Sequence, residues 1–310
     1  MNYPQLVKSK SAIISLISVI RVPLELLRHF KTTNILCKFK IFFCRTVEIH
    51  TFVFKINANM KRFLILAYQI IIWFPLSLIS TILTALTVMI GCCLGGERFF
   101  SYYPGVWWSR IFCVLTFSPV KVVGREKLDK KQSYIFVANH QGAYDIFLIY
   151  GYLGVPIKWV MKQSLRKLPF IGLACQVSGF IFVDNSSPKA AAKTVQEAEK
   201  KLKNGASIAI FPEGSRSKTG KLGKFKKGAY QMALDLKMPI VPVTINGTYD
   251  VMPRNSFAIN PHKMEMIIHD PISTEGLTSD NLRDAALHIR TLVEKSKAEI
   301  ESSLWEKYKD

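Results

Sequence analysis

The sequence predicts an α/β fold: a single domain with a mixed, partly parallel sheet flanked by helices, preceded by an N-terminal membrane-anchoring helical segment. Three observations predict it: residues 63–96 carry no charged side chain, short β-branched runs recur after residue 119, and helical stretches with an apolar stripe alternate with or follow those runs. A chain of 310 residues can hold one large domain or two ordinary ones. We expect a basic extension at 1–59, a membrane anchor at 60–98 and one domain at 99–310.

The extension at 1–59 is of uncertain role. It has a short apolar run, AIISLISVI, and then alternating basic and aromatic residues, which suits an interfacial amphipathic region. The alternative is that the extension does no work, because MKRFLILAYQIIIWF from Met60 already resembles a complete start, with two basic residues before an apolar segment. A secretory signal peptide is not expected, since the apolar stretch is too long and no isolated cleavage pattern follows it.

The uncharged stretch 63–96 is the predicted membrane anchor, because roughly 20 apolar residues suffice to cross a bilayer. Pro75 interrupts it, so the stretch can form one long tilted span or two shorter helices that enter and leave one leaflet. Basic residues flank it on both sides, and this favours a hairpin or leaflet-embedded anchor over a simple crossing.

Overall composition points to a lipid surface. A formal charge of +20 combined with 49% hydrophobic residues fits poorly with a solvated nucleic-acid binder and well with a protein on anionic lipid. The six cysteines show no C-x-x-C spacing and several lie in apolar stretches, which argues against a disulfide framework or a zinc site and for a reducing compartment. We therefore expect membrane lipids and no nucleic acid as partners, no metal, and a membrane location with the α/β domain on the cytoplasmic side.

Four short apolar runs predict the strands. They lie at 120–124, 134–139, 207–211 and 240–245, and the last two are rich in the β-branched residues of strands buried on both faces.

Three helices are predicted between and after the strands. Residues 186–205 begin with a capping Ser187 and Pro188 and end at Gly205. The apolar positions of this helix form one stripe: Ala191, Val195, Ala198 and Leu202. A second helix is expected near 226–237, and a helix opened by TSDN carries the same spacing at Leu282, Ala286, Ile289 and Val293.

Polar loops follow three of the predicted strands: NHQGAYD at 139–145, FPEGSRS at 211–217 and NGTYD at 246–250. Ligands of open α/β sheets collect outside the strand ends, so we expect the three loops to line one crevice. His140 and Asp145 would point roughly 140° apart on a straight helix. A strand that ends and bends through a glycine into a new helix can instead fold the histidine back onto the aspartate.

This pair is a candidate general base. A carboxylate that accepts one ring N–H leaves the other nitrogen as an acceptor, raises its basicity and fixes its tautomer, which suits deprotonation of a hydroxyl. The alternative is a chance spacing in which Asp145 merely lies near a helix start. FPEGSRS could likewise be only a turn with a solvated Arg216. His269 and Asp270 are adjacent on a strand and point to opposite faces, so we assign them no role.

Four blocks in order resemble the lysophosphatidate acyltransferase family, and more broadly the glycerolipid acyltransferases. NHQGAYD is similar to the family's N-H-x-x-x-x-D block, and the other three are GFIFVDN at 179–185, FPEGSRS at 211–217 and VPVTINGT at 241–248. The resemblance spans about residues 119–275. Asn185 departs from the pattern, because the family usually has arginine there, which leaves family-level phosphate contacts at this position in doubt. Ser215 replaces the common threonine and keeps the hydroxyl.

The resemblance implies that 99–310 is a glycerolipid-acyltransferase-like domain. It implies transfer of a fatty acyl group from acyl-CoA or acyl carrier protein to the sn-2 hydroxyl of lysophosphatidate, giving phosphatidate in phospholipid biosynthesis, with no cofactor. His140 and Asp145 would be catalytic, and Arg216 would hold a phosphate bidentately. The substrate-binding residues that it implies are Asn139, Gly179, Asp184, Phe211, Pro212, Glu213, Gly214, Ser215, Arg216 and Pro242. Two alternatives stay open: another acceptor, such as glycerol 3-phosphate, another lysophospholipid or an aminolipid, or a non-catalytic membrane lipid-binding protein.

Overall fold

The computed structural model divides the chain into two compact units, Met1–Phe63 and Leu64–Asp310. The structure describes residues 60, 62–183, 194, 196–198, 200, 202 and 206–306. The extension at 1–59 lies outside the described residues, as do Asp184 and Asn185, so the architecture below is that of the second unit.

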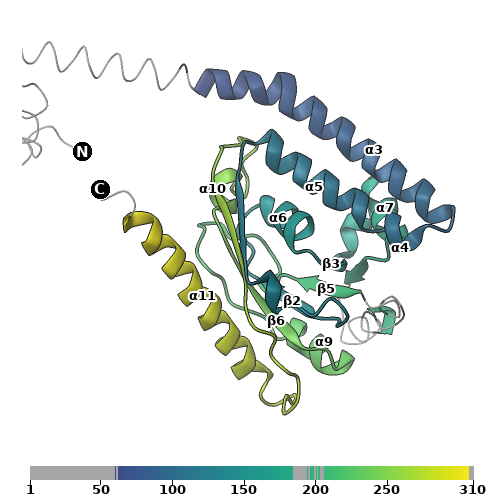
Figure 1. Cartoon of the computed structure of the whole chain (residues 1–310), viewed down its shortest axis with the longest axis vertical. Coiled ribbons are helices and arrows are strands. Elements are labelled where there is room, and N and C mark those ends of the chain that lie inside the picture. Colours follow the sequence, from purple (N-terminus) through teal and green to yellow (C-terminus); the bar gives the residue numbers. More distant parts are fainter. Residues whose placement is uncertain are drawn as a thin grey trace, which may run out of the picture. The chain divides into compact units, whose positions relative to one another are not determined.

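A mixed sheet forms the centre of the second unit (Figure 1). The described strands are β1 (Val120–Val123), β2 (Ile135–Ala138), β3 (Ile157–Lys162), β4 (Ile181–Val183), β5 (Ser207–Ile210), β6 (Ile240–Asn246) and β7 (Met264–Ile268). They form a seven-stranded sheet in the order β1-β7-β6-β2-β5-β3-β4. β6 and β7 are antiparallel, and the other neighbouring pairs are parallel. The predicted mixed, partly parallel sheet is therefore confirmed.

Helices flank this sheet, as predicted. They are α3 (Phe74–Cys93), α4 (Glu97–Phe100), α5 (Tyr103–Leu115), α6 (Tyr144–Tyr152), α7 (Ile171–Val177), α9 (Gly228–Leu236), α10 (Thr248–Val251) and α11 (Leu282–Glu306), with shorter turns η2 (Gln69–Trp73), η3 (Arg125–Lys127) and η4 (Gln163–Lys167). Most of the predicted helix 186–205 lies outside the described residues. Two positions of its predicted stripe are described: Ala198 is fully buried and Leu202 packs beside it in the same core.

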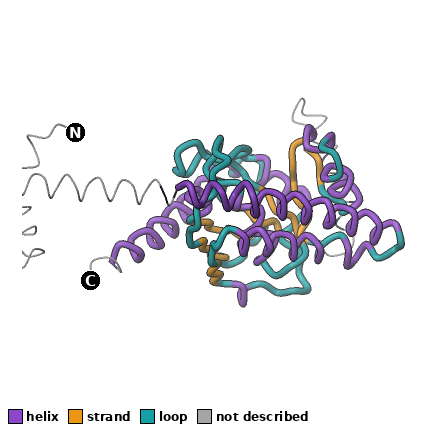
Figure 2. Tube along the Cα trace, turned by 90° about the horizontal axis from the view of Figure 1, so that it is seen from above, coloured by secondary structure: helices purple, strands orange, loops and turns teal. Residues whose placement is uncertain are grey.

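The sheet separates two hydrophobic cores. Alternate residues of β2 show the division: Phe136 and Ala138 enter the first core, whereas Ile135 and Val137 enter the second. The first core is covered by α5 and α6, with α3 packed on α5, and the second by α9 and α11. Figure 1 shows these two sets of helices on opposite sides of the strands, and in the view from above α3 crosses in front of the strands (Figure 2). Both faces of the central strands are thus buried, as expected for parallel strands.

One described helical stretch, Arg62–Cys93, is long and apolar enough to cross a membrane. Pro75 lies in the first turn of α3, directly after the π-helical turn η2, so the missing N–H is accommodated and the chain continues as one helix. The buried side of this helix is mostly composed of small residues: Ser77, Ala85, Val88 and Gly91. Its other sides expose leucine, isoleucine and phenylalanine. After Gly95, whose φ is +85°, the chain turns, and α5 runs back beneath α3 (Figure 1).

Candidate active site

The loop between β2 and α6 brings His140 and Asp145 together. His140 Nδ1 lies 2.7 Å from Asp145 Oδ2, so the contact predicted from the five-residue spacing is present. The same carboxylate oxygen accepts the backbone N–H groups of Gln141 at 2.6 Å and Gly142 at 3.0 Å. Asp145 is fully buried. One carboxylate therefore closes the whole turn and fixes the imidazole.

Gly142 allows this turn to lie close to the segment that follows β6. A Cβ atom on Gly142 would lie 2.4 Å from the carbonyl oxygen of Thr248, the first residue of α10, which follows β6. The backbone of Ala143 also donates to Met252 O at 3.4 Å. Only glycine allows the loops after β2 and β6 to approach this closely. Two of the three predicted polar loops thus pack directly on each other.

The imidazole of His140 has one nitrogen left for chemistry. When Nδ1 carries the hydrogen, it donates to Asp145, and Nε2 is an acceptor. The His140 ring stacks on Phe211, with centroids 3.9 Å apart and planes inclined by 8°. Phe211 stacks in turn on Trp159 of β3 at 5.4 Å and 23°. Trp159 was not predicted, because a lone tryptophan in a strand carries no signal beyond burial. The stack holds the ring in place from the side of β5 and β3.

Glu213 joins the second loop to the first. Its Oε1 accepts the His140 backbone N–H at 2.9 Å, and its Oε2 accepts the Gly223 N–H at 2.9 Å. Burial raises the pKa of the Glu213 carboxyl above its ordinary value, while these two N–H groups act in the opposite direction. A Cβ on Gly223 would lie 2.5 Å from Oε2. Glu213, which the sequence predicted to bind substrate, therefore holds the two loops together. Its partner Gly223 was not among the residues predicted from the sequence.

Asn139 joins the end of β2 to β6. It is fully buried. Its side-chain amide donates to Ile245 O at 2.9 Å, and its amide oxygen accepts the Ile245 N–H at 2.7 Å. Because both ends of the amide bind the backbone of β6, Asn139 fixes the end of β2.

Two other predicted residues lie away from this edge of the sheet. The register places Pro242 opposite Val137 in the middle of β6, where it is buried. Gly179 precedes β4, and the position where its Cβ would be lies 3.4 Å from Lys158 Nζ at the start of β3. The structure therefore does not bring Pro242 or Gly179 to His140. Asp184 follows β4 and lies outside the described residues.

The turn after β5 forms a basic rim beside the site. Gly214 has a φ of +74°, and its N–H closes a turn onto the Phe211 carbonyl at 3.0 Å. Ser215 is exposed on this turn and Arg216 is partly buried, with the Arg216 carbonyl accepting a hydrogen bond from Arg254 Nη1 at 3.0 Å. Pro212 is buried below and its carbonyl accepts the backbone N–H of Lys226 at 3.0 Å.

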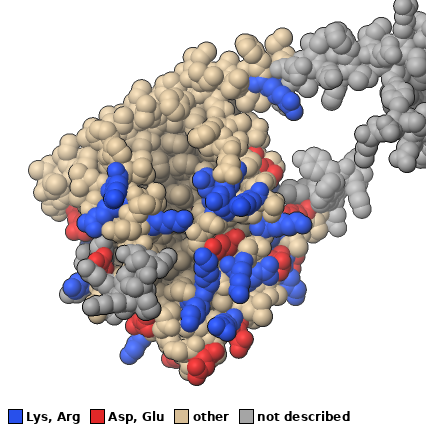
Figure 3. Space-filling view, turned by 180° about the vertical axis from the view of Figure 1, so that it is seen from behind, with Lys and Arg blue, Asp and Glu red and all other residues tan. Residues whose placement is uncertain are grey.

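Additional cations surround this turn. Lys226 Nζ lies 3.1 Å from the position of a Cβ on Gly214, and Lys162, which ends β3, lies at the same edge of the sheet. Among the described residues, no carboxylate lies within ion-pair distance of Arg216, Lys226 or Lys162. Figure 3 shows Lys and Arg side chains gathered below the uncharged surface of α3. This concentration of positive charge favours phosphate groups.

The reactive side of the site faces the layer that contains α3. Residues 136 and 138 of β2 point into the first core, so His140 continues the same face. Phe211 and Trp159 also pack against that core. The imidazole and the apolar helices α3 and α5 therefore share one side of the sheet. No group of three or more His, Cys, Asp and Glu side chains within the described residues is arranged to hold a metal ion.

Comparison with known proteins gives consistent relatives. A family model described as Acyltransferase matches residues 119–246. The 1-acyl-sn-glycerol-3-phosphate acyltransferase of Saccharomyces cerevisiae is 39% identical over 174 residues, which are 55% of this chain and 57% of that protein. The protein of the same description from Haemophilus influenzae is 32% identical over 201 residues, covering 64% of this chain and 82% of that protein.

A solved structure is also similar. The crystal structure of the 1-acyl-sn-glycerophosphate (LPA) acyltransferase PlsC from Thermotoga maritima superposes with a TM-score of 0.66 at 26% identity, covering 78% of this chain and 97% of that one. Against the relatives from S. cerevisiae, Brassica napus and Arabidopsis thaliana, the match spans 57%, 58% and 49% of their lengths. The ordered sequence blocks, the fold and these relatives agree: the chain belongs to the 1-acyl-sn-glycerol-3-phosphate acyltransferase family.

Proposed function

We propose that this protein is an O-acyltransferase that moves a fatty acyl group from a thioester to the sn-2 hydroxyl of lysophosphatidate, giving phosphatidate. The observation that carries the proposal is the imidazole of His140, held by Asp145 at 2.7 Å and by Phe211 at its face, beside an unpaired basic rim. The relatives described above carry the matching name.

The reaction needs one base and no protein nucleophile. His140 Nε2 takes the proton of the acceptor hydroxyl as its oxygen attacks the thioester carbonyl. The C–O bond forms, the C–S bond breaks, and the imidazolium returns the proton to the leaving thiolate. Asp145 stabilises the imidazolium while it exists. Because a thiolate is a good leaving group, this sequence of steps is complete without a cofactor.

Recognition of the acceptor is assigned to the rim. Arg216 offers a planar, bidentate fork that matches a phosphate monoester, and Lys226 adds a point charge on the same turn. The same positive field would attract the phosphates of acyl-CoA or an acidic acyl carrier protein, so both donors remain part of the proposal.

The shared layer supports a location at a membrane. Lysophosphatidate resides in a leaflet, and His140 lies on the same side of the sheet as α3 and α5. We place the protein at a membrane, held by its apolar helical segment, with the catalytic domain on the cytoplasmic side.

The test is release of free thiol from an acyl thioester in the presence of lysophosphatidate, with the purified full chain. His140→Ala should lower kcat by about 10² to 10⁴ and leave the circular dichroism spectrum unchanged. His288→Ala is the matched control, because His288 is exposed on α11. Near-normal turnover by His140→Ala would overturn the mechanism. Asp145→Asn should also impair turnover, because the tautomer is no longer fixed.

Arg216→Lys tests the acceptor. It replaces a bidentate fork with a point charge, so we expect KM for lysophosphatidate to rise and kcat/KM to fall roughly ten- to a hundredfold. The KM for the thioester should change less. Varying each substrate in turn, with acyl-CoA and with acyl carrier protein as donors, distinguishes the two sides of the site. A rise confined to the donor KM would assign Arg216 to the donor instead.

A further inference from the structure

The segment after β3 presents apolar side chains to the outside. Residues 162–171 are all exposed. Between residues 165 and 173, which we call the apolar shelf, five large side chains are 39–53% exposed: Leu165, Leu168, Phe170, Ile171 and Leu173. A contiguous group of this kind marks a surface that contacts something apolar, whereas single exposed leucines need no explanation.

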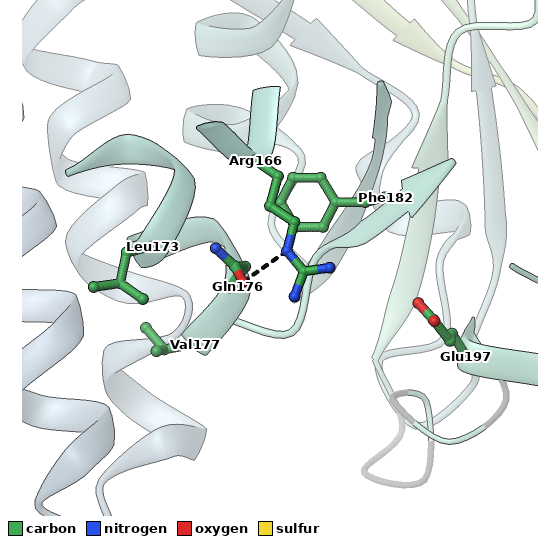
Figure 4. Close-up of a pocket in the computed structure, with 6 residues that line it drawn as sticks. All are labelled: Arg166, Leu173, Gln176, Val177, Phe182 and Glu197. Carbon is green, nitrogen blue, oxygen red and sulfur yellow. Dashed lines mark hydrogen bonds between the residues drawn. The ribbon is translucent and has the colours of Figure 1, made fainter. Parts of the chain in front are cut away.

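The apolar shelf is ordered, so its exposure is not the result of a loose loop. The Gly172 N–H donates to Leu168 O at 2.9 Å. Arg166 Nε donates to Gln176 Oε1 at 2.8 Å, and its guanidinium lies 5.9 Å from the centre of the Phe182 ring (Figure 4). These contacts brace η4 against α7 and β4. They border a pocket of about 410 Å³ lined by Arg166, Leu173, Gln176, Val177, Phe182 and Glu197.

Phe170 is the most unusual residue of the apolar shelf. Its φ is +58°, and the Ile171 N–H bonds to Pro169 O at 2.6 Å across it, which makes a γ-turn with positive φ. Such a turn is strained for a bulky residue. The same turn leaves the ring 52% exposed. The fold thus holds an aromatic side chain outward at a cost in free energy, and contact of the ring with an apolar medium would offset that cost.

The surroundings of the apolar shelf indicate which medium. Its helix α7 packs on α3, whose outer sides are apolar, so the two surfaces are continuous. Lys162, Arg166 and Lys167 are exposed within or beside it, and none has a carboxylate within ion-pair distance among the described residues. Apolar side chains interleaved with unpaired cations match the interface of an anionic bilayer.

We propose that the apolar shelf is a second bilayer contact, in addition to the apolar helix α3. It begins three residues after Lys162, at the edge of the sheet where His140 lies. The contact would hold the rim of the crevice at the lipid surface, so that an acceptor moves from leaflet to site without leaving the interface. This role in substrate entry rests on the proposed function, whereas the lipid contact itself does not.

Lipid contact is tested by fluorescence quenching. Phe170→Trp and Leu287→Trp each add one indole to the five tryptophans of the chain. Leu287 is the matched control, because it is 60% exposed but lies on α11, on the other side of the sheet. The full chain is placed in phosphatidylcholine vesicles containing phosphatidylglycerol, with plain or brominated acyl chains. We expect brominated lipid to quench the added emission of Phe170→Trp and to spare that of Leu287→Trp.

The opposite result would overturn the proposal. Equal or absent quenching at the two positions would mean that the apolar shelf faces water, a protein partner or a second copy of the chain. This readout needs no turnover, so it decides the contact even when the proposed function fails.

Substrate entry is tested by kinetics. The triple variant Leu168→Ser, Phe170→Ser and Leu173→Ser should lower the rate about tenfold with lysophosphatidate in vesicles. It should leave the rate unchanged with a short-chain lysophosphatidate kept below its micelle concentration. Leu287→Ser should change neither rate. An equal loss with both acceptors would show damage to the site rather than loss of lipid contact, and would overturn the entry role.

Discussion

The helices on the two sides of the sheet differ in the side chains that they present outward. On α11 the buried stripe Leu282, Ala286, Ile289 and Val293 is backed by a charged outer face. That face carries ion pairs such as Arg290–Glu294, at 2.8 Å. On α3 the buried side is made mostly of small residues, and the outer sides are leucine, isoleucine and phenylalanine.

The difference teaches that the inward stripe identifies a helix but not its surroundings. A stripe at helical spacing is present on α11, which is amphipathic in the manner of a helix in water. Small residues on the packed side and large apolar ones outside are typical of helices whose other neighbour is lipid. The side chains on the outer face of a helix therefore indicate the medium around it. His140 lies on the same side of the sheet as α3, the helix whose outer face is apolar.

The largest expected effect comes from removing the α3 layer. Deletion of residues 1–96 should expose the first core, where Phe112 and Trp108 pack, and leave the protein aggregated and inactive. Deletion of residues 1–59 should leave membrane retention and activity largely intact, because Arg62–Cys93 remains. Fractionation by centrifugation, with activity measured in each fraction, distinguishes the two. Release of the shorter deletion into the soluble fraction would show that residues 1–59 are the essential anchor.

A single charge on each outer face sharpens the comparison. Leu83 is 59% exposed on α3, and Leu287 is 60% exposed on α11. Leu83→Asp should weaken vesicle binding on the order of a hundredfold, because a carboxylate in the apolar region of a bilayer is costly. Leu287→Asp should bind like the parent. Co-flotation with vesicles measures both, and equal behaviour of the two variants would remove the distinction between the layers.

The smallest effect is expected on the charged face. Glu301 forms an i, i+4 pair with Lys297 on α11. Glu301→Gln should change the free energy of unfolding by no more than about 0.5 kcal/mol, because exposed pairs of this kind are weak. Urea unfolding in mild detergent at low and high salt checks it. A loss above 2 kcal/mol that persists in high salt would mean that this face packs against something other than water.

Sequence patterns found four of the seven described strands. β2, β5 and β6 lie within one residue of their predicted positions, and α9 lies inside its predicted range. β7 was missed because Glu265 interrupts its apolar run. The structure satisfies that carboxylate with Lys263 at 2.6 Å and Lys121 at 3.7 Å. β3 was missed because Lys158 and Lys162 interrupt its apolar pattern. Both strands pair with strands that are distant in the sequence, and no local pattern contains that pairing.

The site was predictable to a similar extent. The spacing of His140 and Asp145, with a glycine between them, was enough to predict that the side chains meet. The roles of Glu213 and Asn139 were not, because both bind backbone groups far along the chain, at His140 and Ile245. A polar residue in a motif that resembles a known family can serve the substrate or the scaffold, and only the three-dimensional contacts distinguish the two.

The pairing of β1 with β7 bears on how the protein is made. Val120 lies opposite Met264, so the first strand must wait for the last one before the sheet can close. At ribosomal rates of roughly 5–20 residues per second, the intervening chain takes about 7 to 30 seconds to emerge. The apolar helix α3 precedes every described strand and is available to lipid throughout that interval. We therefore expect translation to deliver the helix to a bilayer first, and the catalytic domain to complete its folding at the membrane surface.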